Sequence, residues 1–469
     1  MNTFTATYTD QYQLAMSEVY FLNGKKDEKA VYDYFFRKTP FKGSYALFAG
    51  LETLLDVLEK FEFTPEDIKF LKNQGFNPKF LEYLKSFQFN GTIFSTREGD
   101  LVFPTAPVLT VEANIIEAQI IESMLLNILN FQTLIATKAS RIRHVAGNKK
   151  LIDFGLRRAQ STGAYHASRA AFIGGFDATS NVKAGMDFNI PVSGTMAHAF
   201  IQAHDNELDA FRHFAQHHPN DCVLLVDTYD TLRIGLPNAI KVAKEMEKHG
   251  NRLTGIRLDS GDLAYLSKEA RKMLDNAGLG YVKIAASNQL DEHLIKSLCE
   301  QGAKIDVYGV GTGLITGQPD AALDGVFKLA HFRGKDRIKL SNSTTKITLP
   351  GKKHVFRTFD TDGNFFGVDI VCMSNEKMVN KIVHPHDSLK SMETKHLKTE
   401  PVLYKVIENG KRIQKKKSTV EIAKFAKNQL MKLTKEYKRL QYSHLYKVGI
   451  SDQLNTERNN LIKFNKKKQ

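Results

Sequence analysis

The sequence has only three cysteines among its 469 residues: Cys222, Cys299 and Cys372. They are far apart and odd in number, and no Cys-x-x-Cys pair occurs. The sequence therefore supports neither a disulfide framework nor a zinc knuckle. This cysteine usage predicts a reducing compartment, the cytoplasm.

Long hydrophobic runs are also missing. No apolar run approaches the roughly 20 residues that a membrane-spanning helix needs. The opening residues, MNTFTATYTDQYQLAM, have neither the basic n-region nor the apolar h-region of a signal peptide. We therefore expect no membrane partner and no secretion.

Charge is unbalanced, with a formal net charge of +15. Such an excess is compatible with nucleic acid, a membrane surface or anionic small molecules as partners. Much of it lies late in the chain, in KRIQKKK (411–417) and the terminal lysines, which suits a solvated basic tail. Because zinc-finger spacing and an RNP-like aromatic pattern are absent, we expect no nucleic-acid partner. The histidines, including His217 and His218, lack the spacing of metal ligands.

The remaining composition is that of a soluble globular protein, and the length suggests two or three domains. Residues 1–130 mix helix and strand signals and predict an α+β N-terminal domain, in which Thr64 is the expected N-cap of a helix. Strand-like sequence from about 340 to 400 is expected to join that domain. Residues 401–469 are expected to form a helical, Lys-rich C-terminal region.

Residues 131–340 have a different sequence pattern, in which short apolar runs alternate with amphipathic helical stretches. Alternating strands and helices predict a parallel sheet, because parallel strands need crossover connections. About eight units predict an α/β fold, an irregular β/α barrel that holds the active site. The runs are LIDFG (151), GFDATS (175), VSGTMAH (192), CVLLVDTYD (222), TGIRLDSGD (254), KIAASNQ (283), KIDVYGVGTG (304) and VFKLA (326).

Polar residues follow the apolar runs, at what should be the carboxyl ends of the strands. These ends converge on one mouth in a β/α barrel, where active sites lie. Some such residues only cap the next helix, and Asp262 and Asp291 suit that role. The others exceed what capping requires: Asp153, Asp177, His198, Asp227, Asp259, Asn288 and Thr312.

Two of these segments suit a flat, anionic ring. Phe154 can stack on a ring, and Arg157 and Arg158 can pair with a carboxylate or phosphate. Arg257 and Asp259 are two apart on a strand and therefore share a face. The alternatives are a core phenylalanine with surface arginines, and a structural ion pair.

The segment VYGVGTG (307–313) suits a phosphate, because its glycines allow backbone N–H groups to approach and Thr312 adds a hydroxyl. It lacks the third glycine of a dinucleotide fingerprint and is a weak signal alone. His198 follows the Gly194-Thr195 corner and is expected at the same mouth. An imidazole there could act as a base or as a nucleophile toward phosphorus, although a lone histidine in a first helical turn is more often without a role.

Nine segments carry a further signal: TDQYQLAM, FFRKTPFKGSYALFAGL, DFGLRRAQ, GGFDATSNVKAG, SGTMAHAF, DTYDTLRIGLPN, GIRLDSGDL, SNQLDE and YGVGTGLIT. Together these motifs resemble the nicotinate phosphoribosyltransferase family. The resemblance runs in order from about residue 8 to 350, and nothing beyond about 400 contributes to it. The arginine-rich segment DFGLRR and the segment GTMAH argue against the alternative interpretation, the related nicotinamide phosphoribosyltransferase.

The resemblance implies an enzyme of NAD salvage. Nicotinate and 5-phosphoribosyl 1-diphosphate would give nicotinate mononucleotide and diphosphate, coupled to hydrolysis of ATP to ADP and phosphate. It implies Mg²⁺ held largely by diphosphate, and a homodimer whose active sites are shared between subunits. The family's phosphorylated histidine lies in its Gly-Thr-x-Ala-His motif, so the resemblance makes His198 the catalytic residue.

The resemblance also implies substrate contacts. Tyr12 would stack on the pyridine ring from the neighbouring subunit, and Phe154 would cover the other face. Thr195 and Arg257 would contact nicotinate, with Arg157 near its carboxylate or the phosphate. Further substrate contacts are expected from Asp177, from Asp259 and Asn288 by the ribose and diphosphate, and from Gly311 and Thr312 at the 5-phosphate. Because the nicotinamide enzyme has an aspartate like Asp177, this residue does not separate acid from amide.

Overall fold

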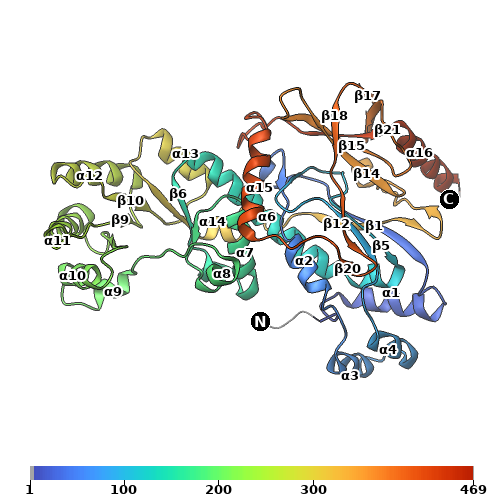
Figure 1. Ribbon diagram of the computed structural model, residues 1–469, viewed down its shortest axis with the longest axis horizontal. Coiled ribbons are helices and arrows are strands. Elements are labelled where there is room, and N and C mark those ends of the chain that lie inside the picture. Colours follow the sequence, from blue (N-terminus) through green and yellow to red (C-terminus); the bar gives the residue numbers. More distant parts are fainter. Residues whose placement is uncertain (1–4, 468–469) are drawn as a thin grey trace. The chain divides into compact units, whose positions relative to one another are not determined.

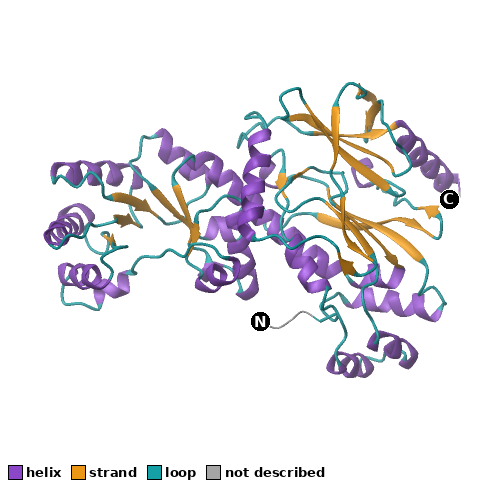
Figure 2. Ribbon diagram, in the orientation of Figure 1, coloured by secondary structure: helices purple, strands orange, loops and turns teal. Residues whose placement is uncertain are grey.

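The structure is a computed structural model that describes residues 5–467. Its contacts divide the chain into two compact units, residues 1–137 with 322–469 (unit 1) and residues 138–321 (unit 2). Figures 1 and 2 show that strands and helices are mixed in both units. The fold is therefore mixed α/β, as expected.

Unit 1 contains a seven-stranded antiparallel sheet in the order β13-β12-β1-β5-β3-β19-β20. Its strands are β1 (Lys29–Phe36), β3 (Thr92–Ser95), β5 (Leu109–Asn114), β12 (Gly325–Phe332), β13 (Lys335–Asp336), β19 (Tyr404–Glu408) and β20 (Lys411–Arg412). A two-stranded sheet joins β2 (Ala46–Leu47) and β4 (Leu101–Val102). The helices of this part are α1 (Gln11–Leu22), α2 (Leu51–Leu58), α3 (Pro65–Asn73), α4 (Pro78–Lys85), α5 (Ile115–Ile120) and the 3₁₀ helix η1 (Pro40–Lys42). Helix α6 (Glu122–Ala146) begins in unit 1 and continues into unit 2.

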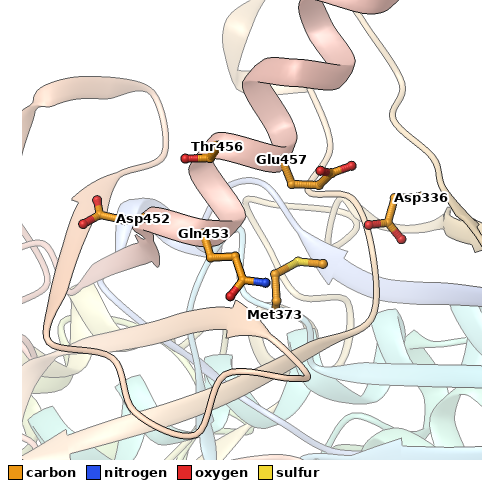
Figure 3. Close-up of a pocket in the computed structure, with 6 residues that line it drawn as sticks. All are labelled: Asp336, Met373, Asp452, Gln453, Thr456 and Glu457. Atoms are coloured by element: carbon orange, nitrogen blue, oxygen red, sulfur yellow. The ribbon is translucent and has the colours of Figure 1, made fainter.

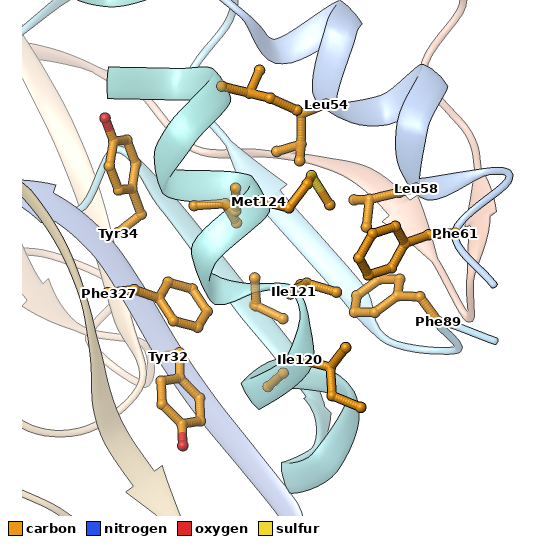
Figure 4. Packing of buried hydrophobic residues seen from close by; sticks show 14 of the residues in the cluster. Tyr32, Tyr34, Leu54, Leu58, Phe61, Phe89, Ile120, Ile121, Met124 and Phe327 are labelled. Carbon is orange, nitrogen blue, oxygen red and sulfur yellow. The ribbon is translucent and has the colours of Figure 1, made fainter. Parts of the chain in front are cut away.

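The core of this sheet is aromatic. Tyr32 of β1 stacks on Phe327 of β12, with ring centroids 4.9 Å apart, and Figure 4 shows both in the cluster that also contains Ile121 and Met124. The hydroxyl of Tyr32 donates to Gln119 over 3.1 Å, so this buried tyrosine keeps a hydrogen bond. The predicted N-cap is confirmed: the Thr64 hydroxyl accepts from the Asp67 amide at the start of α3.

A second sheet of unit 1 has six strands in the order β17-β16-β21-β15-β14-β18. Its pairs are antiparallel except β15 with β21. The strands are β14 (Lys353–Phe359), β15 (Phe365–Met373), β16 (Lys381–His384), β17 (Asp387–Glu393), β18 (Lys398–Pro401) and β21 (Lys447–Ser451). The other elements here are η4 (Thr344–Lys346), α15 (Thr419–Lys432) and α16 (Asp452–Lys467).

The prediction of a helical region from 401 onward was wrong. Three strands in this part, β19, β20 and β21, enter the two sheets of unit 1 alongside α15 and α16. A turn signal explains the hairpin between β19 and β20. Asn409 and Gly410 form its two-residue loop with φ of 49° and 75°, the left-handed conformations that an Asn-Gly hairpin turn requires.

Unit 2 is built on a parallel six-stranded sheet in the order β7-β6-β11-β10-β9-β8. Its strands are β6 (Lys150–Asp153), β7 (Ala178–Thr179), β8 (Val223–Leu225), β9 (Gly255–Leu258), β10 (Lys283–Ala286) and β11 (Val307–Val310). Its helices are η2 (Leu156–Arg158), α7 (Ser161–Ile173), α8 (Val182–Phe188), α9 (His198–Gln202), α10 (Glu207–His217), η3 (Thr231–Gly235), α11 (Leu236–Lys248), α12 (Leu263–Asn276), α13 (Glu292–Glu300) and α14 (Thr312–Ile315). Asp262 and Asp291 cap α12 and α13, as predicted.

A closed eight-stranded barrel is not confirmed. The run at 192 makes one parallel bridge, Val192 to Thr179, and no strand, because the preceding Pro191 has no N–H to donate to a ladder. The run at 326 is β12, which pairs antiparallel with β1 in unit 1. With the Val192 bridge, the strand order is cyclic as in a β/α barrel, but no strand pairing joins Val192 to β8 within residues 5–467.

No described helix combines the length and the apolar character that crossing a membrane requires.

Candidate active site

Arg257 is the centre of a polar cluster at the carboxyl ends of the strands of unit 2. Its Nη1 donates to the Thr195 hydroxyl over 2.9 Å, and its Nε donates to the Ser287 hydroxyl over 2.8 Å. Its Nη2 forms an ion pair with Asp259 at 2.8 Å. The side chain is only 12% exposed. Contacts from three separate segments therefore fix the guanidinium in one orientation.

The Phe154 ring lies beside this guanidinium, with the Arg257 carbon 5.4 Å from the ring centroid. Phe154 follows β6, and its N–H donates to the Val310 carbonyl of β11. Gly309 makes room for the ring, since a Cβ there would lie 2.3 Å from a Phe154 ring carbon. The pair presents an aromatic face beside a fixed cation, which suits a flat anionic ring.

Asp259 is held as a carboxylate. Burial alone would favour its neutral form, but the hydrogen bond from Ser287 and the charge of Arg257 outweigh burial and lower the pKa of Asp259. Its backbone N–H donates to Asp227 over 2.8 Å, and the Ser260 hydroxyl donates to the same Asp227 oxygen over 2.6 Å. The ends of β8 and β9 are thus tied together through two acidic residues.

His198 begins α9 and faces both of these carboxylates. Its Nδ1 lies 3.0 Å from the Thr228 hydroxyl. Its Nε2 lies 3.9 Å from Asp227 Oδ1 and 3.8 Å from Asp259 Oδ2. The Asp227 oxygen is buried and finds no hydrogen-bond donor within the described part of the chain. The His198 ring is 40% exposed, so a ligand can reach it.

The turns after β10 and β11 carry the expected phosphate-binding residues. Asn288 is exposed and has a φ of 90°, a left-handed conformation that asparagine tolerates better than most residues. Gly311 precedes the short helix α14, which begins at Thr312. The first amides of a helix have no acceptor within it, so backbone N–H groups are available here.

Three expected site residues are not part of the cluster around Arg257. Asp177 precedes β7 and accepts from the Leu151 amide at the start of β6, while pairing with Arg143 at 2.5 Å. It therefore lies at the amino ends of these strands, and the expectation that it joins the mouth was wrong. Arg157 is exposed in η2. Tyr12 belongs to unit 1, on α1, and is 51% exposed.

Sequence reasoning missed two hydroxyl residues of this cluster. Ser287 bonds both Arg257 and Asp259, and Thr228 contacts His198. Each lies beside a polar strand-end residue that the sequence did indicate, Asn288 and Asp227. A serine or threonine next to a strand end was the available signal, but such residues are common in turns and do not indicate a site alone.

The donor set does not form a protein metal cage. Within residues 5–467 no group of three or more His, Cys, Asp or Glu side chains could hold a metal ion. Asp227 and Asp259 supply two carboxylates beside His198. This arrangement fits Mg²⁺ that arrives on phosphate oxygens and takes few ligands from protein.

A hollow in unit 1 has a different chemistry from the Arg257 cluster. It has a volume of about 490 Å³ and carries three carboxylates (Figure 3). An anionic ligand would be repelled there, whereas Arg257 offers it a cation. The residues lining this hollow are Asp336, Met373, Asp452, Gln453, Thr456 and Glu457.

Three family models match the chain. Residues 7–130 match the nicotinate phosphoribosyltransferase N-terminal domain, residues 149–362 the nicotinate phosphoribosyltransferase family, and residues 352–458 the corresponding C-terminal domain. The C-terminal match includes residues beyond about 400, where no sequence motif indicated the resemblance.

Individual relatives agree over nearly the whole chain. A nicotinate phosphoribosyltransferase of Bacillus subtilis is 46% identical, and the aligned region covers 95% of this chain and 92% of the relative's chain. One of Dictyostelium discoideum is 36% identical over 96% of this chain and 87% of its own. The crystal structure of human nicotinic acid phosphoribosyltransferase superposes with a TM-score of 0.87 at 30% identity, covering 97% of this chain and 99% of that one. The chain belongs to the nicotinate phosphoribosyltransferase family.

Proposed function

We propose that this protein is an enzyme that transfers the phosphoribosyl group of 5-phosphoribosyl 1-diphosphate to nicotinate, with ATP hydrolysis coupled to the transfer. The observation that carries the proposal is the fixed Arg257 guanidinium beside the Phe154 ring. A flat ring with a carboxylate is the ligand that this pair suits. The relatives named for this activity support it, since they match along nearly the full chain.

Nicotinate would bind with its ring on Phe154 and its carboxylate toward Arg257 and Thr195. Arg257 donates one hydrogen bond from Nε, two from Nη1 and one from Nη2 to the protein, which leaves one of the five N–H groups of a guanidinium for the substrate. It can therefore hold its position and still donate to a carboxylate. Tyr12 of a neighbouring subunit would cover the other ring face, in a homodimer with shared sites.

The reaction would break the bond between C1 of the ribose and a diphosphate oxygen, and form a bond from C1 to the pyridine nitrogen. The products are nicotinate mononucleotide and diphosphate. Asp259 and Asn288 would contact the ribose and diphosphate, and Gly311 and Thr312 would bind the 5-phosphate. Arg157 would face the phosphate or carboxylate from η2. Bound Mg²⁺ would neutralise charge on the phosphate oxygens.

His198 would accept the γ-phosphoryl group of ATP, releasing ADP, and would later lose it to water as phosphate. Its 40% exposed ring supports this role, because ATP can reach it. The transfer does not itself need ATP, because diphosphate is a good leaving group. ATP would therefore add driving force or raise the affinity for the phosphoribosyl donor.

We place the enzyme in the cytoplasm, a reducing compartment. The three cysteines are free in the structure, which supports this location.

Steady-state assays with two bases test the proposal. Nicotinate should give a kcat/KM at least about a hundredfold higher than nicotinamide, because the neutral amide cannot form the charge-assisted contact with Arg257. Chromatography identifies the mononucleotide formed. A preference for nicotinamide would overturn the proposal in favour of the amide enzyme.

A further inference from the structure

The second sheet of unit 1 carries a large hollow that the proposed reaction does not use. Its volume is about 1080 Å³, the size that holds a small organic molecule. Strands β16, β17 and β21 and the segment 436–446 before β21 supply most of its lining. The described lining residues all belong to unit 1, so this hollow is separate from the cluster around Arg257.

Positive charge dominates the lining. Arg439, Lys390 and Lys447 are cationic, and Glu436 is the one acidic residue of the described lining. Lys390 pairs with Asp387 at 3.0 Å, whereas neither Arg439 nor Lys447 forms an ion pair within the described chain. Glu436 lies within electrostatic reach of Arg439, but the three cations outnumber this one anion, which suits a ligand that supplies negative charge.

Three imidazoles also line the hollow: His384, His386 and His444. The Nδ1 atom of His386 is buried and has no hydrogen-bond partner among the described residues. Burial, with the nearby charge of Arg458, lowers the pKa of His386. The lowered pKa favours the neutral ring, so His386 contributes a hydrogen-bonding group to the lining rather than a charge.

The rest of the lining suits an aromatic ring. Val368, Ile382 and Val448 are buried beneath the hollow, while Tyr442 is 98% exposed at it. Tyr442 also has a φ of 49°, a conformation that is uncommon for a residue with a Cβ. An aromatic side chain this exposed is available to stack on a ring.

We propose that this hollow binds a nucleotide, with phosphates at Arg439 and Lys447 and the base against Tyr442 and the apolar floor. A free phosphate ion would use the cations alone and leave the apolar floor and Tyr442 uncovered. The size, the floor and the exposed ring together favour a phosphate carried on an aromatic base. The site is independent of the proposed function, since it shares no residue with it.

Photolabelling of the full chain with 8-azidoadenosine 5′-triphosphate, followed by peptide mapping, tests the site. Saturable labelling is expected in peptides that contain residues 381–392 or 436–447. The double variant Arg439→Ala, Lys447→Ala should lower the affinity of this labelling at least about tenfold, because it removes two charge-assisted contacts. Tyr442→Ala, at an almost fully exposed position, should lower it about threefold or more.

The matched control is Lys424→Ala, Lys427→Ala, which removes the same charge from exposed positions on α15 outside the hollow and should leave the labelling unchanged. Competition separates the possible anions: ATP should protect these peptides, and orthophosphate at equal concentration should not. Equal protection by orthophosphate, labelling that does not saturate, or equal loss in the control variant would each overturn the proposal.

Discussion

Arg257 and Phe154 come from β9 and from the turn after β6, and the guanidinium carbon of one lies 5.4 Å from the ring centroid of the other. The two strands are not neighbours, since β11 and β10 lie between them. Only the parallel sheet of unit 2 brings these side chains together at one edge. Their meeting is the feature on which recognition of an anionic ring depends.

Arg257→Ala should lower kcat/KM for nicotinate at least about tenfold, because a charge-assisted hydrogen bond to the carboxylate is lost. Arg257→Lys should restore little, since an ammonium cannot reproduce the planar fork that contacts Thr195, Ser287 and Asp259. Steady-state kinetics measure both. Arg252→Ala, near the amino end of β9, is the matched control, and an unchanged kcat/KM in Arg257→Ala would remove Arg257 from the site.

Gly309→Ala should damage the nicotinate site without touching a polar residue. Its Cβ would lie 2.3 Å from a Phe154 ring carbon, so the ring must move. We expect a higher KM for nicotinate, by about tenfold if one ring contact is lost, and little change in the KM for the phosphoribosyl donor. Gly280→Ala, where a Cβ would make only an ordinary contact with Asp275 at 3.6 Å, is the control. Equal KM values in wild type and Gly309→Ala would show that the Phe154 position is unimportant.

Thr228 should affect the phosphorylation of His198. Its hydroxyl lies 3.0 Å from Nδ1 and fixes the ring orientation. Labelling with [γ-³²P]ATP should give an acid-labile, base-stable phosphohistidine in wild type. Thr228→Val should lower the labelling rate several-fold, roughly the effect of one lost hydrogen bond, and Thr228→Ser should retain it. The same rate in Thr228→Val and wild type would refute a positioning role.

Sequence reasoning identified most of the Arg257 cluster because strand-end polar residues lie at one edge of a parallel sheet. It placed Asp177 at the wrong end of a strand. Strand β7 has only two residues, and the sequence did not show that it begins after Asp177 rather than ending before it. It also counted β12 as a barrel strand, because a short apolar run does not show which other strand it will pair with. The Asn409-Gly410 pair is a hairpin signal in the sequence, but the Lys-rich composition around it led to the prediction of a helical region.

Tyr12 tests whether sites are shared between subunits. Tyr12→Ala and Asp259→Ala chains should each be nearly inactive, and a mixture of the two should regain activity after subunit exchange. In a mixed dimer one site would hold an intact Tyr12 and an intact Asp259, which predicts up to about a quarter of wild-type activity from random pairing. If exchange is verified and activity does not return, Tyr12 does not act on a neighbour's site.

The central claim is tested most directly by measuring nicotinate mononucleotide formation with and without ATP, in wild type and in His198→Ala. Wild type should form the mononucleotide from nicotinate and 5-phosphoribosyl 1-diphosphate, faster with ATP and with release of ADP. His198→Ala should keep a slow transfer that ATP does not stimulate, because the ring and phosphate contacts remain. Absence of the mononucleotide in wild type, or stimulation of His198→Ala by ATP, would contradict the account.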